Sequence, residues 1–460
     1  MKNLFRALYT GLIAALALSG CDKESEKTFS LLIDDATPLE QGQTIDMEVG
    51  ESFSVITYCG EERAQDYKWS SSDETVALVH SYGTVEALHG GEAKITMSHE
   101  DTTISFNVRI PVVEHASLYY FFRGVAYDDE NQTAYWRDYF FIDGVLQDED
   151  CNILKTDESG NIYQGYLADG KLNLKRNGVE VAKDKPVLGD IAKFVAKGGK
   201  AYLLTNEWEE FLHPGVSAHC YIVSAAGDWR DIDLDLSSYG SPAGSVSFVD
   251  EDSDGNILIW GGITQGDHWY APLLSRIWHI DIAGNIRCHY CDYYDEAKDW
   301  YMGPFSDGAL DMDDNVYYLA DKQVWKAGKI DNDFFNIYRH EGKYLYKLGE
   351  SSSRPNGIAR SHGLEMIVRG SDIWFALCDE VSDFKYEVDI YKNGRLYLTA
   401  AKSKKEGYIG EYIDFSITPS GDLYTIYTVG SGICISKNDQ LIRYQPFDNA
   451  DLPSFAVKER

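Results

Sequence analysis

The sequence predicts an all-β protein in which a small β-sandwich precedes a six- or seven-bladed β-propeller, with seven blades favoured. Three observations lead to this prediction. Aromatic residues and glycine are abundant, with 32 Tyr, 19 Phe, 10 Trp and 40 Gly among 460 residues. Residues 28–112 alternate apolar and polar side chains, and residues 115–460 repeat a turn followed by an apolar-aromatic strand. Few segments carry the periodic apolar spacing of a helix, so both regions are assigned to strands.

The first twenty residues have the layout of a bacterial secretion signal. A basic start precedes the apolar run of residues 12–18, which is too short to span a bilayer. The segment ends in Leu18-Ser19-Gly20-Cys21, which resembles the lipoprotein box of bacteria. The resemblance implies cleavage before Cys21 and attachment of a diacylglycerol to this cysteine. We therefore expect residues 1–20 to be a signal peptide, residues 21–27 to be a polar tether, and acyl chains to be the only membrane attachment.

These features predict a lipid-anchored protein of the bacterial outer membrane. Acidic residues just after Cys21 resemble surface-export signals, whereas an Asp at the position of Asp22 elsewhere marks retention at the inner membrane. The sequence therefore leaves open whether the protein faces the cell exterior or the periplasm. The formal net charge of −32 argues against a nucleic-acid partner, because such partners are bound through Lys and Arg on the phosphates.

Short strands separated by glycine turns predict the sandwich. Residues 53–59 and 104–110 alternate apolar and polar side chains. The most specific motifs are Lys68-Trp69-Ser70-Ser71-Ser72-Asp73, Val76-Ala77, Gly83-Thr84-Val85-Glu86-Ala87 and Gly90-Gly91-Glu92-Ala93-Lys94-Ile95-Thr96. They resemble the bacterial Ig-like group 2 family, whereas Glu61-Glu62-Arg63 and Cys59 depart from its pattern. The resemblance implies an Ig-like sandwich over residues 28–112, with Trp69 between its sheets, that acts as an extracellular spacer or adhesion module.

The propeller is predicted from a repeat in residues 115–460. The equivalent positions, separated by 39, 56, 59, 57 and 50 residues, are Ile162, Ala201, Ile257, Val316, Ile373 and Leu423. A weaker copy begins near residues 118–122, and several copies continue into a strand that ends in Asn-Gly, a typical hairpin turn. About four strands per repeat match a propeller blade, and the repeat resembles units of bacterial surface β-propellers. A β-helix or two further sandwiches are the alternatives.

One acidic loop has the spacing of a calcium site. Asp250, Asp252 and Asp254 precede Gly255 in a D-x-D-x-D-G pattern, in which alternate carboxylates converge on one cation. Position twelve is Gly261, so the bidentate Glu of an EF-hand is missing. The alternative is a solvated hairpin turn, and calcium is the one cofactor that the sequence suggests.

Aromatic side chains beside acids suggest a ligand-binding face. These residues are Trp269, Tyr270, Tyr293, Tyr294, Trp300 and Tyr301. Aromatic rings stack on the apolar faces of sugars while carboxylates accept hydrogen bonds from hydroxyls, so the combination suits a glycan. The alternative is that these rings pack inside the blades.

We therefore expect a binding or adhesion protein whose partner is a glycan or a cell-surface protein. No H-E-x-x-H or G-x-S-x-G motif is present, which favours a binding protein over an enzyme. A propeller hydrolase or lyase acting on polysaccharide is one alternative, because carboxylates are plentiful. A structural scaffold of the envelope is the other.

Overall fold

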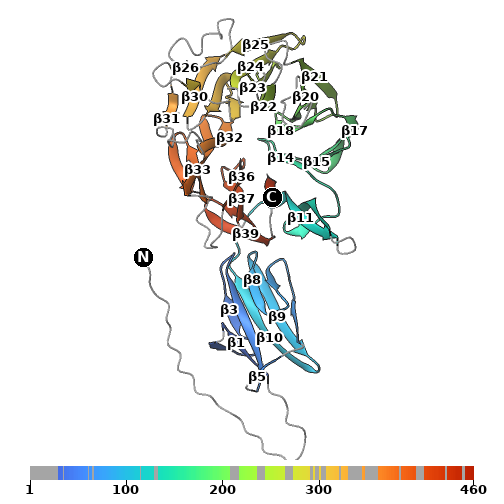
Figure 1. Ribbon diagram of the computed structural model, residues 1–460, viewed down its shortest axis with the longest axis vertical. Helices are drawn as coiled ribbons and strands as arrows, with labels where there is room; N and C mark the ends of the chain where they lie inside the picture. Colours follow the sequence, from blue (N-terminus) through green and yellow to red (C-terminus); the bar gives the residue numbers. More distant parts are fainter. Residues whose placement is uncertain are drawn as a thin grey trace, which may run out of the picture.

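The computed structural model shows a chain built of strands, in which a narrow sandwich lies at one edge of a broad ring (Figure 1). It describes residues 29–34, 36–60, 62–64, 67–113, 115–128, 133–207, 217–235, 244–264, 273–290, 294–295, 300–301, 307–320, 323–329, 344–347, 361–382, 385–399, 409–429, 432–447 and 451–459. Among these residues no helix is long and apolar enough to cross a membrane. The predicted fold class is confirmed.

Two sheets form the sandwich, which runs from Phe29 to Ile110. The first sheet has the order β2 (Thr37–Leu39), β1 (Phe29–Ile33), β4 (Ser52–Cys59), β8 (Thr84–Ala87) and β7 (Ala77–Val79), with β5 (Glu62–Arg63) also paired to β4. The second has the order β3 (Thr44–Asp46), β10 (Thr102–Ile110), β9 (Gly91–His99) and β6 (Lys68–Ser71). The β3–β10 pair is parallel, and the β9–β10 hairpin is antiparallel.

An apolar core fills the space between these sheets. Val55, Val85, Ile95 and Phe106 are buried in it. Trp69 is half-buried against the same cluster, and its ring meets that of Phe106 edge-on at 6.4 Å between centroids. The alternation read from the sequence therefore points these side chains inward, because side chains of a strand alternate between faces.

Seven four-stranded sheets form the ring in the described part of the chain. From the axis outward, blade 1 consists of β40 (Asp451–Lys458), β11 (Ser117–Asp128), β12 (Thr133–Ile142) and β13 (Val145–Leu146). Blades 2 and 3 consist of β14 (Ile153–Thr156), β15 (Ile162–Ala168), β16 (Lys171–Arg176) and β17 (Val179–Pro186), then β18 (Asp190–Lys197), β19 (Lys200–Asn206), β20 (Ser217–Val223) and β21 (Trp229–Asp235). Blades 4 and 5 consist of β22 (Gly244–Glu251), β23 (Ile257–Thr264), β24 (Leu273–Ile280) and β25 (Ile286–Tyr290), then β28 (Asp307–Leu310), β29 (Asn315–Ala320), β30 (Gln323–Lys329) and β31 (Tyr344–Lys347). Blades 6 and 7 consist of β32 (Ser361–Arg369), β33 (Asp372–Ser382), β34 (Lys385–Lys392) and β35 (Arg395–Thr399), then β36 (Ile409–Ile417), β37 (Leu423–Val429), β38 (Gly432–Lys437) and β39 (Gln440–Pro446).

The ring closes by pairing the two ends of its chain segment. The inner strand β40 comes from the C-terminal end and pairs antiparallel with β11, which opens the propeller. Because a closed ring leaves no free side between first and last blades, this architecture replaces the β-helix and the additional sandwiches considered above. Between blades 4 and 5, β26 (Tyr294–Asp295) and β27 (Trp300–Tyr301) form a separate two-stranded sheet.

The sequence repeat marks the same strand in every blade. Its six equivalent positions all lie at or next to the start of a second strand, and the weaker copy lies in β11. The Asn-Gly turns adopt the positive φ angles that this hairpin needs, with 49° and 80° at Asn177 and Gly178. Asn393 and Gly394 have 50° and 73°.

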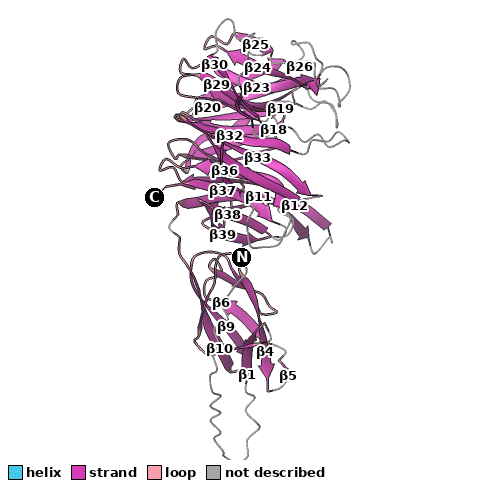
Figure 2. Ribbon diagram, turned by 90° about the vertical axis from the view of Figure 1, so that its left-hand side faces the viewer, coloured by secondary structure: helices cyan, strands magenta, loops and turns pink. Residues whose placement is uncertain are grey.

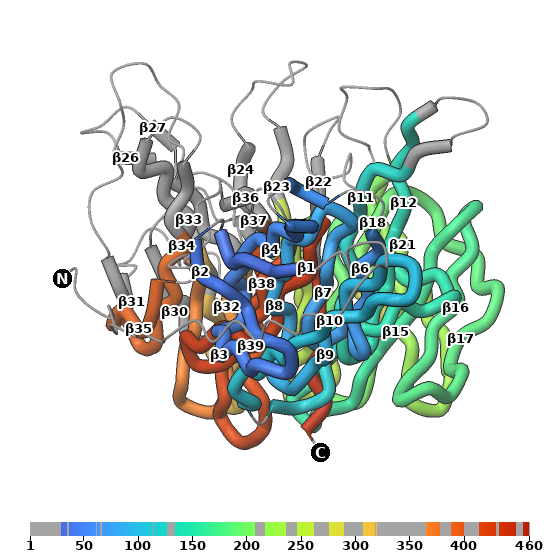
Figure 3. Tube along the Cα trace, turned by 90° about the horizontal axis from the view of Figure 1, so that it is seen from below, coloured from blue at the N-terminus to red at the C-terminus, as the bar shows by residue number. Residues whose placement is uncertain are grey.

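The sandwich packs directly against blade 7 (Figures 2 and 3). Tyr444 N donates a hydrogen bond to Leu88 O at 2.8 Å, and the two side chains share one apolar cluster. His89 forms a β-bridge with Arg443, and its Nε2 lies 2.7 Å from Nε2 of His115. Burial, with Arg443 and His115 nearby, lowers the pKa of His89 to about 4. This imidazole is therefore neutral at pH 7 and suits an interface of apolar and backbone contacts.

Candidate functional site

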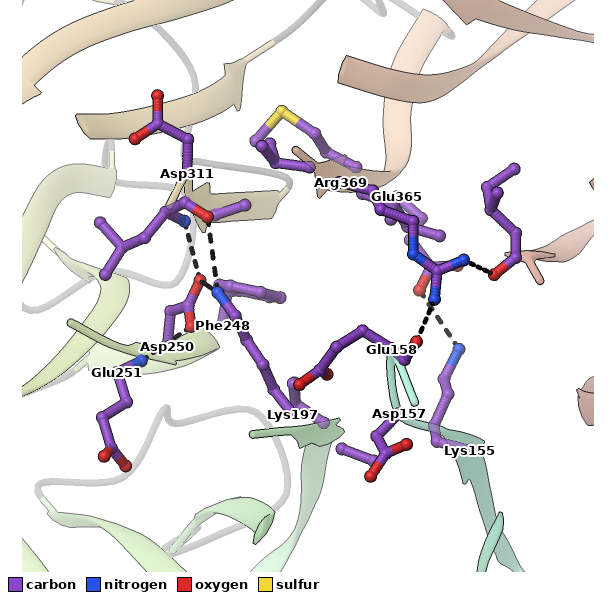
Figure 4. Close-up of a pocket in the computed structure, with 18 of the residues that line it drawn as sticks. Lys155, Asp157, Glu158, Lys197, Phe248, Asp250, Glu251, Asp311, Glu365 and Arg369 are labelled. Atoms are coloured by element: carbon purple, nitrogen blue, oxygen red, sulfur yellow. Dashed lines mark hydrogen bonds and ion pairs between the residues drawn. The ribbon is translucent and has the colours of Figure 1, made fainter. Parts of the chain in front are cut away.

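A cavity of about 440 Å³ lies in the centre of the propeller, where the inner strands end. All seven inner strands contribute to its lining, together with the turns that follow several of them (Figure 4). Eight carboxyl side chains and four cationic side chains line it. The acids are Asp157, Glu158, Asp250, Glu251, Asp252, Asp311, Asp314 and Glu365, and the cations are Lys155, Lys193, Lys197 and Arg369. Apolar side chains such as Phe248 and Met366 complete the wall.

Asp250 connects three blades at this cavity. Its side chain is 1% exposed, and Oδ2 accepts hydrogen bonds from Lys197 Nζ at 2.6 Å and from Leu310 N at 2.7 Å (Figure 4). Oδ1 accepts a hydrogen bond from the amide of Glu251 at 2.7 Å. Both oxygens are thus occupied, which compensates for the loss of hydration on burial.

Asp307 repeats this arrangement one blade further on. Oδ2 accepts a hydrogen bond from Met366 N at 2.7 Å, and Oδ1 accepts one from Gly308 N at 3.0 Å. The nearest cation is Lys193, whose Nζ lies 3.8 Å from Oδ2. Burial raises the pKa of Asp307 to about 6, against the opposing charge of Lys193. Lys193 is 23% exposed and therefore keeps donors that a ligand could use.

Lys155 holds two carboxyl groups on neighbouring blades. Its Nζ lies 2.7 Å from Asp414 Oδ1 and 3.2 Å from Glu365 Oε1. Burial raises the pKa of Asp414 to about 7, and the charge of Glu365 raises it further. Burial would also raise the pKa of Glu365, but the charges of Lys155 and Lys193 hold it at about 2. Of the two carboxyl groups beside Lys155, Glu365 is therefore ionised at neutral pH. Asp414 is the one that holds a proton near neutral pH.

At the rim, Arg369 bridges two further blades. Its Nη1 donates a hydrogen bond to Ile417 O at 2.5 Å, and Nη2 donates to Glu158 O at 2.8 Å (Figure 4). Because both contacts are to backbone carbonyls on other blades, this guanidinium fixes the width of the cavity mouth.

The predicted calcium ligands do not converge. Asp250 faces the cavity, whereas Asp252 Oδ1 accepts hydrogen bonds from Asp254 N at 3.0 Å and Asn256 N at 2.8 Å. Within the described ranges, no three His, Cys, Asp or Glu side chains are grouped so that they could hold a metal ion. Calcium at this loop stays a prediction.

The same turn recurs without a calcium motif. In each case a carboxylate accepts hydrogen bonds from the amide four residues later and from the side chain of the Asn there. The pairs are Asp157 with Asn161, Asp252 with Asn256, Asp281 with Asn285, and Asp311 with Asn315. Asp252 therefore has a structural role that Asp157, Asp281 and Asp311 share.

Of the other predicted site residues, the structure describes at most the backbone. Cys21, Trp269, Tyr270 and Tyr293 lie outside the described residues. For the remaining three only the backbone is described, with Tyr294 opposite Tyr301 and Asp295 opposite Trp300 across β26 and β27.

The sequence analysis missed most of the charged residues around the propeller axis. These are Lys155, Lys193, Lys197, Asp307, Glu365 and Asp414, and of the buried acids only Asp250 was singled out, for calcium. A signal exists, since Lys155, Asp250, Asp307, Glu365 and Asp414 each lie seven to nine residues before the repeat position of their blade. Charged residues at this recurring place in apolar strands would have indicated a charged channel.

The comparisons with known proteins agree with the two-part architecture. Residues 32–105 match the family model of the bacterial Ig-like domain (group 2). The chain therefore combines an Ig-like domain of this class with a seven-bladed β-propeller. No curated protein matches the sequence.

Solved structures resemble the chain only distantly. A quinonprotein alcohol dehydrogenase-like protein from Bacteroides thetaiotaomicron is 13% identical, with 90% of this chain and 96% of that chain covered and a TM-score of 0.39. An endo-arabinase from the same organism is 11% identical, with 59% and 94% covered and a TM-score of 0.34. Likenesses this weak carry no argument about activity.

Proposed function

We propose that this chain is a lipid-anchored protein of the bacterial outer membrane whose propeller binds a glycan in its central channel. Acyl chains on Cys21 would hold it at the membrane, and the Ig-like domain would serve as a spacer. The resemblance of residues 18–21 to a lipoprotein box supports the anchor. The contacts between the sandwich and blade 7 support a spacer that presents the propeller in one orientation.

The observation that carries the proposal is the chemistry of the cavity. A volume of about 440 Å³ falls within the range of small-molecule pockets. Its apolar wall suits the C–H faces of a sugar, and its ion pairs supply donors and acceptors for hydroxyl groups. Lys193 is the best-placed donor, because its ion pair is long and its side chain is partly exposed.

The partners of the acids favour binding over hydrolysis of a glycan. Asp250 and Asp307 each accept backbone amide hydrogens with both oxygens, and Asp414 is held by Lys155 and by the hydroxyl of Ser454 at 2.9 Å. A general acid and a nucleophile need lone pairs that reach the substrate. Carboxyl groups that join neighbouring blades are poorly placed for that role.

The test is titration of the purified full chain with a panel of oligosaccharides. Lys193→Met should weaken the affinity about tenfold, which corresponds to about 1.4 kcal/mol. Lys193→Arg should retain most of it, and Lys183→Met, at a side chain that is 68% exposed, should change nothing. Equal affinities for the wild type and Lys193→Met would contradict the channel site. If no oligosaccharide binds, the result would favour the alternative that the protein is a structural scaffold of the cell envelope.

The aromatic segments remain part of the proposal as an additional contact surface for a glycan or a cell-surface protein. The described strands that precede these segments, β23 and β25, run in the same direction and finish at the same end of blade 4. Trp269→Ala and Trp300→Ala should each weaken binding. Unchanged affinity in both variants would remove them from the site.

A further inference from the structure

A second cavity, of about 470 Å³, lies between blades 1, 2 and 3. It is lined by β11 and β12, by the turn between β15 and β16, and by Gly189, Asp190 and Ile191 at the start of β18. The central cavity instead includes Lys197, at the end of β18. Its lining on this strand begins at Lys193, two residues after Ile191, so the two cavities lie toward opposite ends of β18.

One ion pair forms the polar wall of this second cavity. Arg123 Nε lies 2.9 Å from Asp138 Oδ1, and Nη2 lies 3.5 Å from Oδ2. The Arg123 side chain is 44% exposed and holds the Asp138 carboxylate at the surface of the cavity. Asp169 stands opposite in a tight turn, where positive φ angles of 50° and 68° at Asp169 and Gly170 fix its position.

An exposed tryptophan extends the same wall. Arg123 faces Asp138 across the β11–β12 pair, and Val125 faces Trp136 two residues further along. Side chains two apart share a face of a strand, so Trp136 lies beside Asp138 while Tyr135 points to the other face. Trp136 is 57% exposed, which is unusual for so large an aromatic ring and places its face in reach of a ligand.

We propose that this groove binds a neutral glycan, with a sugar ring stacked on Trp136 and its hydroxyl groups donating hydrogen bonds to Asp138 and Asp169. The carboxylates of Asp138 and Asp169 accept hydrogen bonds from hydroxyl groups, and they come from two different blades that line the groove. Three acids, Asp138, Asp169 and Asp190, face one arginine in the lining, which disfavours an acidic sugar. The inference shares with the proposed function only the class of ligand, because no residue is common to the two cavities.

The test uses the full chain and neutral tetrasaccharides of β-1,4-glucan, α-1,4-glucan, β-1,4-mannan and β-1,4-xylan, measured by titration calorimetry. For the tetrasaccharide that binds, Trp136→Ala should weaken the affinity about tenfold or more. Tyr135→Ala is the matched control, since this neighbouring side chain is 48% exposed on the opposite face of the strand and should leave the affinity unchanged. Asp138→Asn should also weaken binding and keeps the side chain's shape.

The outcomes separate this groove from the central channel. Loss of affinity in Trp136→Ala but not in Lys193→Met supports the groove and argues against the channel as the site for that sugar. The reverse pattern, equal effects of Trp136→Ala and Tyr135→Ala, or no binding of any of the four tetrasaccharides would overturn the groove proposal. Thermal unfolding of each variant should match the wild type, and a Trp136→Ala protein that has lost its fold is replaced by Trp136→Phe, for which a smaller loss of affinity is expected.

Discussion

The sandwich and the propeller bury different kinds of side chain. The described residues of the sandwich bury no charged side chain, and Thr57 and Ser105 are the polar residues inside it. The propeller buries Asp250, Asp307 and Asp414 around its axis, with lysines beside them. Buried ion pairs add little net stability, because desolvation offsets their attraction. The difference indicates that the sandwich is built for stability, whereas the channel keeps charges that stability alone does not require.

The largest expected effect tests the charged channel. Lys155→Met should lower the free energy of unfolding by about 3–5 kcal/mol at pH 8, because Asp414 and Glu365 then lose their shared cation. The loss should shrink at pH 5, since Asp414 has a pKa of about 7 and is protonated there. Urea unfolding at the two pH values measures this. A loss no larger than that of the exposed Lys183→Met would show that the channel charges are not coupled.

The matching test in the sandwich removes apolar volume instead of charge. Phe106 is fully buried, and Phe106→Ala should cost about 3–5 kcal/mol of stability at every pH between 5 and 8. Glycan affinity of the folded protein should not change, because the cavity lies in the propeller. A stability loss in Phe106→Ala that changes strongly with pH would contradict the proposed difference between the two regions.

A smaller effect follows from Asp307. Its pKa is raised from 3.8 to about 6 in the folded protein, so the folded state holds this proton more tightly than the unfolded state. Its contribution to stability is therefore fully present below about pH 4 and is lost as the pH rises through about 6. Removing Lys193 should raise this pKa further. Lys193→Met should consequently destabilise the protein by about 1 kcal/mol more at pH 8 than at pH 5. Equal losses at both pH values would contradict the ion pair.

An effect of similar size concerns a turn on the outside of blade 2. Asn177 has a φ of 49°, and its side chain accepts a hydrogen bond from Ile162 N at 3.0 Å. Asn177→Ala should cost about 1–2 kcal/mol, because alanine is strained at positive φ. Asn177→Gly removes the strain and should cost less. Thermal unfolding ranks the two variants, and the opposite order would show that the turn conformation is not what Asn177 provides.

The sequence predicted the second strands of the blades better than the first. Second strands such as β23 combine an apolar-aromatic run with a preceding turn, which is a local signal. The inner strand β18 carries Lys193 and Lys197 among its apolar residues, so its sequence resembles that of an exposed strand. The acids that pair with these lysines lie on other blades and are not visible in the local pattern. The pairing of β40 with β11 joins residues more than 300 positions apart, and no local pattern encodes it.

Exchange of backbone amide hydrogens, with and without a saturating oligosaccharide from the panel, tests the central claim most directly. Ligand in the channel should slow exchange in β28 and β32, whose Leu310 and Met366 amides bond to Asp250 and Asp307. Strands β9 and β10 of the sandwich should exchange at the same rate in both samples. Protection confined to the sandwich, or equal rates in β28 and β32 with ligand bound, would contradict a binding site in the channel.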